Sequence, residues 1–441
     1  MLKKLQLKNV GPAPSMELEL GERLNVLTGD NGLGKSFLLD IAWWALTRQW
    51  PAEINPHLTS GKKALPTNGG DASISFSFTG KSKEDSYTST FDRQAQAWTG
   101  RAGRPANPGL VLYAMSDGSF AVWDPARNYW KKKGNIDVQD RPPAYVFCPP
   151  EVWDGLKSES GGSACEGLIR DWASWQKEKG PVFDQLCRVL DSLSPSEGES
   201  LEPGKLTRIS LDDTRDMPTV KMSYGQEVPL VHASAGMRRI VALAYLLVWA
   251  WDEHCKAAKV LGDDTARQVI FLIDEIEAHL HPRWQFQIVP ALLGVIKSLT
   301  NPPVIDVLEH GAQPPDVQVV TATHSPMILA SLEPVFDPKT DTWFDLDYSG
   351  PDRTGVLLTR REFERHGDVT NWLTSEAFDL SSGRNPEYEK LLNDASSLLD
   401  KKDADRGEVA KMDARLREAL SPTDPFLFTW RGIREKKGLL P

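Results

Sequence analysis

The sequence lacks the features that would place it in a membrane or in an oxidising compartment. No apolar run among its 441 residues approaches the ~20 residues that a bilayer-spanning helix needs, and the longest, residues 240–251, is typical of a buried helix. The N-terminus alternates like a strand and has no apolar signal-peptide core. The four cysteines are far apart and match no paired metal-ligand spacing. We therefore expect no disulfide framework and a cytoplasmic protein.

The sequence also lacks an excess of positive charge and any sign of a coiled coil. Its formal net charge is −10, so the surface as a whole does not attract nucleic acid, and DNA binding would need a local basic patch or a partner. No heptad run of three or more repeats occurs, which excludes a long coiled-coil arm. Hydrophobic residues make up 40% and charged residues 25%, which is typical of one large or two modest globular domains.

What the sequence does contain is an alternation of apolar strands and amphipathic helices. The periodicity predicts strands over 3–8 and 16–28, short antiparallel strands with turns between 72 and 124, and a short apolar strand at 144–147. Helices dominate 151–193, two strand-like runs (206–211 and 217–223) follow, and the tail from 369 is mostly helical. The remaining predicted core elements are helix 35–48, helix 234–255, strand 268–273, helix 282–299 and strand 317–321.

Residues 29–36 read Gly-Asp-Asn-Gly-Leu-Gly-Lys-Ser and fit the phosphate-loop pattern G-x-x-x-x-G-K-[ST] completely. They lie between a predicted strand and a predicted helix, which is the context that this motif requires. We expect the main chain at Asn31, Gly32 and Gly34 to surround the phosphates of a nucleotide at the helix N-terminus. Lys35 would reach the β and γ oxygens, and the Ser36 hydroxyl would bind Mg²⁺.

Two carboxylates end a fully apolar run. Residues 269–273 lead directly into Asp274 and Glu275, and such a run is typical of a parallel strand buried on both faces. The C-terminal ends of these strands are where α/β sheets bind ligands. We expect Asp274 to hold Mg²⁺, directly or through water, and Glu275 to polarise the attacking water as general base.

A second anion site is indicated at residues 233–239, which read Ala-Ser-Ala-Gly-Met-Arg-Arg and open the long helix. Lys35 and Asp274 are far apart in the sequence, which indicates a large insertion between them. The anion site at 233–239 cannot easily contact a nucleotide bound to the phosphate loop of its own chain. We expect Ser234 and Gly236 to cap the γ-phosphate held by a second copy. Serine is also a common helix N-cap, so a purely structural role stays open.

A histidine follows the next apolar strand. Residues 319–326 end in Thr-His-Ser-Pro, so His324 should stand at the same sheet edge as Asp274. A single histidine is more often structural, but its position in this order makes it a candidate sensor of the γ-phosphate.

Together these motifs carry a family resemblance. The phosphate loop, the Ser-x-Gly turn, the Asp-Glu-x-Glu-x-His-Leu-His-Pro run at 274–282 and the Thr-His-Ser-Pro run resemble the ABC-type ATPases of the SMC/RecF/OLD group. In particular, they are similar to the ATPases of bacterial anti-phage systems such as Septu and the retrons. The resemblance implies ATP-driven head-to-tail homodimerisation and signalling to an effector such as a nuclease, with any nucleic-acid contact indirect and no membrane contact.

The implied fold is α/β, an ABC-type P-loop core with an antiparallel β insertion, a helical signature lobe and a helical C-terminal region. We expect the core at 1–50 and 225–335, the β-rich insertion at 51–150, a helical lobe with a loop at 151–224, and a mostly helical region at 336–441.

The sequence departs from the family pattern at two points. The signature reads Ala-Ser-Ala-Gly-Met instead of Leu-Ser-x-Gly-Gln/Glu, and no Q-loop glutamine follows the strand at 144–147, where Pro149, Pro150 and Glu151 stand. These differences affect what the family resemblance implies about the residues that close over the nucleotide and about the rate of ATP turnover.

Two other functions stay open. A DNA-clamping ATPase head of the RecF/SMC type would bind duplex tightly and in a salt-sensitive way. A self-contained OLD-like nuclease would cleave DNA with Mg²⁺ or Mn²⁺. The pair Asp345 and Asp347 resembles the Asp-x-Asp of its Toprim domain, but we favour a strand with solvated acids. Two basic clusters are either nucleic-acid contacts or solvated surface: Arg127, Trp130 and 131–133, and Arg431, Arg434, Lys436 and Lys437.

Overall fold

The computed structural model describes the chain except for residues 81–83, 101–105, 129–140, 159–160, 196–199, 301–313, 351, 379, 381, 401–404 and 440–441. The chain divides into two compact units, Met1–Gly367 and Asp368–Pro441. Both the phosphate loop and the carboxylate strand belong to the first unit, which therefore holds the candidate site.

An eight-stranded mixed sheet is the centre of the first unit. Its strand order is β17-β16-β3-β15-β14-β7-β8-β9. The five strands from β16 to β7 run parallel, and β17, β8 and β9 are antiparallel to their neighbours. The strands are β3 (Leu24–Gly29), β7 (Leu110–Ala114), β8 (Phe120–Trp123), β9 (Tyr145–Phe147), β14 (Gln268–Asp274), β15 (Asp316–Ala322), β16 (Thr342–Ser349) and β17 (Gly355–Arg361).

The parallel order explains the apolar runs in the sequence. Strands β3, β7 and β14 are buried over nearly their whole length, because helices or a second sheet cover both faces. The C-terminal ends of β3, β15 and β14 lie side by side at one end of the parallel strands. We call this end of the sheet the nucleotide edge, and the other end of the same strands the opposite edge. The parallel order brings together chain segments that are far apart in sequence.

A five-stranded antiparallel sheet covers one face, with helix α1 (Lys35–Thr47) packed against strands of both sheets. The strand order of this five-stranded sheet is β2-β1-β4-β5-β6. Strand β4 alternates between buried and half-buried side chains, as a sheet with one packed face should. The strands are β1 (Leu2–Lys8), β2 (Ser15–Glu19), β4 (Ser73–Thr79), β5 (Glu84–Asp92) and β6 (Ala97–Trp98).

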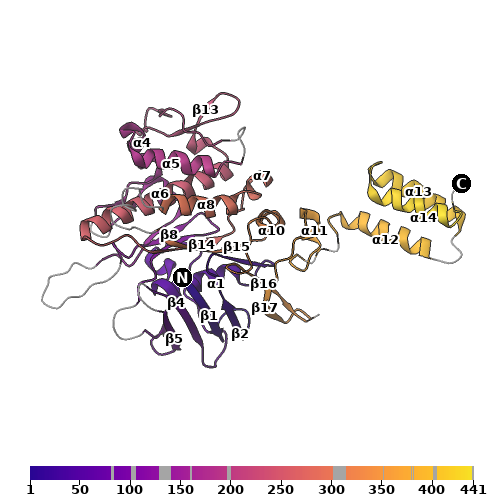
Figure 1. Ribbon diagram of the computed structural model, residues 1–441, viewed down its shortest axis with the longest axis horizontal. Helices are drawn as coiled ribbons and strands as arrows, with labels where there is room; N and C mark the ends of the chain where they lie inside the picture. The colour runs from indigo at the N-terminus through magenta and orange to yellow at the C-terminus, as the bar shows by residue number, and fades with distance from the viewer. Residues whose placement is uncertain are drawn as a thin grey trace. The chain divides into compact units, whose positions relative to one another are not determined.

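Helices cover the other face of the large sheet (Figure 1). The long helix α6 packs with α4, α5 and α8, and α8 contacts β15. These helices are α4 (Leu168–Glu178), α5 (Pro181–Ser192), α6 (Ala235–Leu261) and α8 (Ile288–Thr300). The shorter elements around them are α2 (Pro51–Ile54), α3 (Pro149–Asp154), α7 (Pro282–Gln285), α10 (Pro326–Leu332), the hairpin β10 (Leu156–Lys157) and β11 (Ser163–Cys165), and the hairpin β12 (Thr219–Lys221) and β13 (Glu227–Pro229).

The α/β P-loop fold predicted from the sequence is confirmed, but three element predictions were wrong. The strand expected over 16–28 is two strands in different sheets, and a Cβ at Gly21, between them, would lie 2.4 Å from the carbonyl oxygen of Thr340. The run 206–211 forms no strand and contributes only a bridge at Thr207. The helix expected over 282–299 is broken into α7 and α8.

A fourth correction concerns β7, which we expected in the antiparallel insertion. It pairs in parallel with β14, because its five side chains are all buried and need cover on both faces. The region expected to be mostly helical from 336 likewise begins with β16 and β17, which extend the large sheet.

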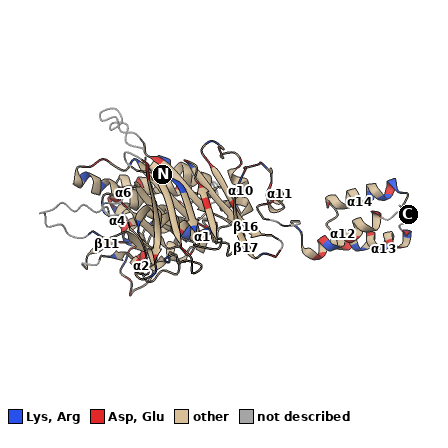
Figure 2. Ribbon diagram, turned by 90° about the horizontal axis from the view of Figure 1, so that it is seen from below, with Lys and Arg blue, Asp and Glu red and all other residues tan. Residues whose placement is uncertain are grey.

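The second unit, Asp368–Pro441, is helical and has a core of its own. It contains α11 (Val369–Leu373), α12 (Pro386–Asp400), α13 (Arg406–Ala419) and α14 (Pro425–Lys436). Trp430 is buried against α13, where its indole donates to Asp413. Residues of both charge signs lie along α12, α13 and α14 (Figure 2).

Within the described part of the chain, no helix is both long and apolar enough to cross a membrane. All four cysteines are free thiols, two of them buried.

Candidate nucleotide site

The phosphate loop joins β3 to α1 at the nucleotide edge. Gly29 and Gly34 have positive φ angles of 129° and 101°, and a Cβ at Gly29 would lie 2.1 Å from the carbonyl oxygen of Leu346. Glycine is therefore required for both the conformation and the space. Asn31 and Gly32 are exposed at the tip of the loop, at the N-terminus of α1 where an anion is stabilised.

Lys35 is buried within this loop. Its Nζ donates to the carbonyl oxygens of Gly29 (2.8 Å) and Asp30 (2.9 Å) and lies 3.3 Å from Nδ1 of His324. Burial lowers the pKa of Lys35 to about 8, against the opposing effect of nearby carboxylates, of which Glu275 acts most strongly. A phosphate at the loop would supply the counter-charge that this ammonium group only partly has.

Asp274 ends β14 and is almost fully buried. Burial raises its pKa, whereas hydrogen bonding to the side chains of Ser36 and Ser116 lowers it. Its Oδ1 has no hydrogen-bond partner. A buried carboxylate oxygen without a partner is costly, and a bound cation would satisfy it.

The side-chain oxygens of Ser36 and Asp274 are suitable ligands for Mg²⁺, which prefers one or two carboxylates together with phosphate and water oxygens. The hydroxyl of Ser36 and the carboxylate of Asp274 would hold the ion. No cluster of three His, Cys, Asp or Glu side chains that could form an all-protein metal site is found among the described residues.

Glu275 follows with an unusual backbone conformation. Its φ is 46°, the left-handed region that non-glycine residues rarely adopt and that is often retained at functional sites. Its main-chain N–H donates to the carbonyl of Ala322 (3.0 Å), and its carboxylate is about one-third exposed and lies 3.3 Å from Nε2 of His324. The side chain is thus anchored at its base and open to solvent at its tip.

His324 stands between the lysine and the glutamate. It follows β15, and its two ring nitrogens face Lys35 and Glu275 at 3.3 Å each. Burial and the charge of Lys35 lower its pKa, against the charge of Glu275. The structure thus brings together four predicted site residues from three strand ends: Lys35, Asp274, Glu275 and His324.

The signature turn begins α6 close to these carboxylates. Ser234 is exposed and caps the helix, accepting from the N–H of Met237 (3.3 Å). A Cβ at Gly236 would lie 2.8 Å from the carbonyl oxygen of His279, so glycine allows the helix start to approach the segment after β14. The structure gives Ser234 a capping role within its own chain and leaves its side chain facing solvent.

Arg239, one turn into α6, connects the signature helix to the carboxylate segment. Its guanidinium donates to the carbonyl oxygens of Ser116 (2.6 Å), Glu275 (2.9 Å) and Asp274 (3.3 Å). Sequence reasoning assigned no role to this arginine. A long side chain that satisfies three carbonyl groups of two loops holds those loops in register.

In the sequence, the position expected for a Q-loop glutamine follows residues 144–147. That strand, β9, is the last strand of the sheet, three positions from β14. The strand beside β14 is β7, and the loop that follows it brings Ser116 to the carboxylate of Asp274. The uninterrupted apolar run at 110–114, typical of a strand buried on both faces, was the sequence signal that could have identified this loop.

Asp345 was expected to be solvated, and it is buried. It accepts from the hydroxyl of Thr28 at 2.7 Å, and Arg361 donates to it at 3.3 Å. Thr28 directly precedes the phosphate loop, so Asp345 supports that loop from the neighbouring strand.

Three of the described residues of the two basic clusters make contacts within the fold. Residues 130–133 lie outside the described part of the chain, but Arg127 pairs with Asp124 and stacks on Tyr145, with its guanidinium carbon 4.2 Å from the ring centroid. Arg434 is buried against Asp413, and Lys437 donates to a main-chain carbonyl.

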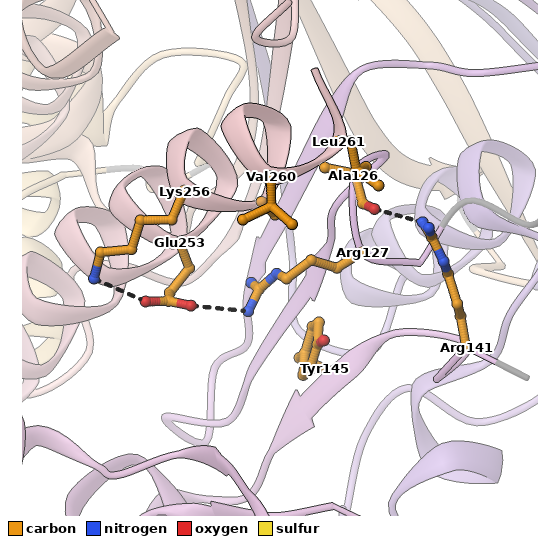
Figure 3. A pocket seen from close by; sticks show the side chains of 9 residues that line it. Ala126, Arg127, Arg141, Tyr145, Glu253, Lys256, Val260 and Leu261 are labelled. Carbon is orange, nitrogen blue, oxygen red and sulfur yellow. Dashed lines mark hydrogen bonds and ion pairs between the residues drawn. The ribbon is translucent and has the colours of Figure 1, made fainter. Parts of the chain in front are cut away.

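A cavity of about 430 Å³ lies between α6 and the start of β9, at the sheet edge opposite the nucleotide edge. Figure 3 shows the side chains that line it. Its lining includes Arg127, Arg141 and Lys256. Arg127 and Lys256 both pair with Glu253, and Arg141 donates to the carbonyl of Ala126. None of the predicted site residues lines this cavity.

Comparison with known proteins agrees with the site geometry. The sequence profile of the family described as "AAA domain, putative AbiEii toxin, Type IV TA system" matches residues 24–330. The chain is 25% identical over 243 residues to "Retron Ec83 probable ATPase" of Escherichia coli, covering 53% of this chain and 36% of that protein. It is 18% identical over 434 residues to "Septu protein PtuA" of Bacillus thuringiensis, covering 97% and 96%. The chain thus spans about a third of the length of the retron protein but nearly all of the Septu protein.

Among solved structures, an SMC head domain from Thermotoga maritima has a TM-score of 0.38 and 13% identity, covering 82% of this chain and 99% of that one. An SMC head bound to the C-terminal winged-helix domain of ScpA has a TM-score of 0.40 and 14% identity, covering 82% and 98%. At such scores, the fold assignment depends on the strand order and on the family match.

Proposed function

The chain belongs to the family described as "AAA domain, putative AbiEii toxin, Type IV TA system", and we propose that it binds and hydrolyses Mg-ATP at the nucleotide edge. The observation that carries the proposal is the convergence of the phosphate loop, Asp274, Glu275 and His324 at the ends of three adjacent parallel strands. In this proposal the protein works in the cytoplasm.

Each side chain has a role that its position supports. Lys35 and the main chain of the phosphate loop bind the phosphates, and Ser36 and Asp274 hold Mg²⁺, which would neutralise charge on the phosphate oxygens. Glu275 accepts a proton from the attacking water, since its carboxylate is anchored by the main chain but reaches solvent. His324, in contact with both Lys35 and Glu275, reports whether the γ-phosphate is present.

The purified chain should release phosphate from ATP in the presence of Mg²⁺ and stop when EDTA removes the metal. Phosphate release is measured with a Ser36→Ala variant in parallel, which should retain less activity because one metal ligand is lost. A parent chain that binds ATP tightly but releases no phosphate would make the site a binding switch and contradict the hydrolytic part of the proposal.

We propose further that two copies assemble head to tail, so that Ser234 and Gly236 of one copy cap the nucleotide of the other. The exposed Ser234 at the N-terminus of a 27-residue helix supports this. A two-fold axis would give two equivalent sites at one interface.

Mixing two inactive variants tests this assembly. Ser234→Arg should block the capping site by bulk and leave the phosphate loop intact, whereas Lys35→Ala does the reverse. A mixed dimer then contains one site with an intact loop and an intact signature, so part of the ATPase activity should return if one site can act alone. A closed, nucleotide-bound structure with Ser234 more than ~10 Å from any phosphate loop would contradict the arrangement, because direct contacts need about 3 Å.

The relatives support a place in anti-phage defence, with ATP turnover controlling a partner effector such as a nuclease. The match to the Septu protein along nearly the whole chain is the main support. Cells that express the gene with its neighbouring genes should survive phage challenge, and Glu275→Gln should remove the protection. Protection that is unaffected by Glu275→Gln would argue against ATP-dependent signalling.

A further inference from the structure

We propose that Glu277 is a positioning residue that holds His324 against Glu275, so that the segment after β14 and the loop after β15 act as one unit. The inference depends on the proposed ATPase function, because it concerns how that site is set.

The contacts of Glu277 join two neighbouring loops. Its Oε1 accepts from the hydroxyl of Thr323 at 2.6 Å and from the main-chain N–H of His324 at 2.8 Å. Glu277 lies in the turn that follows β14, and the two donors follow β15, the adjacent parallel strand. One carboxylate oxygen therefore fixes the backbone of His324 to the segment that carries Asp274 and Glu275.

The burial of Glu277 makes a purely packing role a poor explanation. The residue is buried, with 8% exposure, and burial raises its pKa, against the hydrogen bonds from Thr323 and His324. Its other oxygen, Oε2, is buried without a hydrogen-bond partner. Burying a carboxylate is costly where an apolar side chain would fill the space, so the accepted hydrogen bonds are the feature that accounts for an acid here.

The position of His324 is sensitive to this anchor. Its ring nitrogens already stand at 3.3 Å from Lys35 and from Glu275, near the limit of a hydrogen bond. A shift of the His324 backbone by about 1 Å would break one or both contacts, and displacements of that size can reduce turnover by ~10²-fold.

The same loop offers a matched control. Ser325, the next residue, donates its hydroxyl to Gln285 at 2.6 Å. Gln285→Ala removes a hydrogen bond of similar length from the same loop but leaves the N–H of His324 with its partner. If Glu277 acts through His324, Gln285→Ala should change turnover much less than Glu277→Ala does.

A double-mutant cycle tests the dependence on His324. Glu277→Ala should lower kcat by ~10²-fold while ADP affinity changes less than about twofold, because the phosphate loop is untouched. Glu277→Gln keeps one acceptor oxygen for the His324 N–H and should lose less. Combining Glu277→Ala with His324→Ala should be no slower than His324→Ala alone. Losses that multiply in the double variant would overturn the proposal.

A measurement without turnover separates this inference from the proposed function. In nucleotide-free protein with isotope-labelled histidine, the NMR signal of His324, assigned with His324→Ala, should move in Glu277→Ala. The signal of His254, which lies at the opposite sheet edge, should stay unchanged. An unmoved His324 signal overturns the positioning role, whether or not the chain hydrolyses ATP. Inactivity of the parent chain together with a moved signal would contradict only the proposed ATPase.

Discussion

Two histidine–carboxylate pairs lie at opposite edges of the large sheet and differ in how completely they are satisfied. At the edge opposite the nucleotide edge, Nδ1 of His254 lies 2.7 Å from Asp124 and Nε2 accepts the N–H of Ala266 at 2.8 Å. Both residues are fully buried. At the nucleotide edge, His324 and Glu275 are about one-third exposed and their closest contact is 3.3 Å.

The polar groups around the two pairs also differ in how completely they are hydrogen-bonded. Both oxygens of Asp124 are used, since the N–H of Ala126 and Nε of Arg127 also donate to them. Beside His324, by contrast, buried oxygens of Asp274 and Glu277 have no hydrogen-bond partner. A satisfied buried pair stabilises the fold, whereas an edge with open acceptors supports the proposed binding of a cation and a ligand that carries phosphate.

The largest expected difference between the edges is in chemistry. Glu275→Gln keeps the shape but removes the base, so ATP hydrolysis should fall by ~10²–10⁴-fold while ATP stays bound. The matched change at the other edge, Asp124→Asn, should leave turnover per folded molecule unchanged. Phosphate-release assays on both variants measure this, and hydrolysis by Glu275→Gln at the parent rate would show that Glu275 is not the base.

The next largest difference is in nucleotide binding. Lys35→Ala removes the only side-chain charge of the phosphate loop that faces phosphate, and losing a charge-assisted hydrogen bond costs about 1.5–3 kcal/mol, or ~10–10²-fold in Kd. Lys256→Ala, in the cavity at the opposite edge, should leave the Kd for ATP unchanged. Calorimetric titration compares the two, and equal effects would contradict the assignment of the nucleotide edge.

For the free energy of unfolding, we expect the larger effect at the edge opposite the nucleotide edge. His254→Ala leaves the Ala266 N–H without its partner and removes one of the donors to the buried Asp124, so we expect a loss of about 1–3 kcal/mol in unfolding free energy. His324→Ala removes a ring that is about one-third exposed and should cost less than about 0.5 kcal/mol. Thermal midpoints of the unit Met1–Gly367 give the comparison. A larger loss from His324→Ala would mean that the nucleotide edge is itself a structural element.

The smallest expected effect is a dependence on pH. Burial raises the pKa of Asp124, but His254 and Arg127 outweigh it and the pKa lies below its usual value. A depressed carboxyl pKa contributes stability that is present above the unfolded value, near pH 4, and lost as the pH falls through the folded value. The stability difference between the parent and Asp124→Asn should therefore shrink as the pH falls below 4. A difference that grows below pH 4 would contradict this pairing.

Much of the site could be predicted from local patterns. The phosphate loop needs glycines at two backbone positions and a helix start, and both requirements are written in consecutive residues, 29–36. The apolar run before Asp274 likewise marked a buried strand end, and the Thr-His-Ser-Pro run marked another. The placement of these residues at strand ends could be predicted because it depends on a few neighbouring residues.

Other parts could not be predicted because they depend on which strands become neighbours. The chain order alone does not say that β7, rather than β9, lies beside β14, so Ser116 was missed. The burial of Asp345 against Thr28 follows only when β16 pairs with β3. Glu277 gains its two donors only because β15 runs beside β14.

The sequence by itself therefore determined the chemistry of this protein: a phosphate loop, a pair of carboxylates and a histidine, each at the end of an apolar strand. The tertiary structure alone decided how these groups are supported, since Glu277, Ser116 and Arg239 act through hydrogen bonds to residues far away in the chain. The physical reason is that main-chain conformation is set by local side chains, whereas the partner of a buried polar group is set by long-range packing.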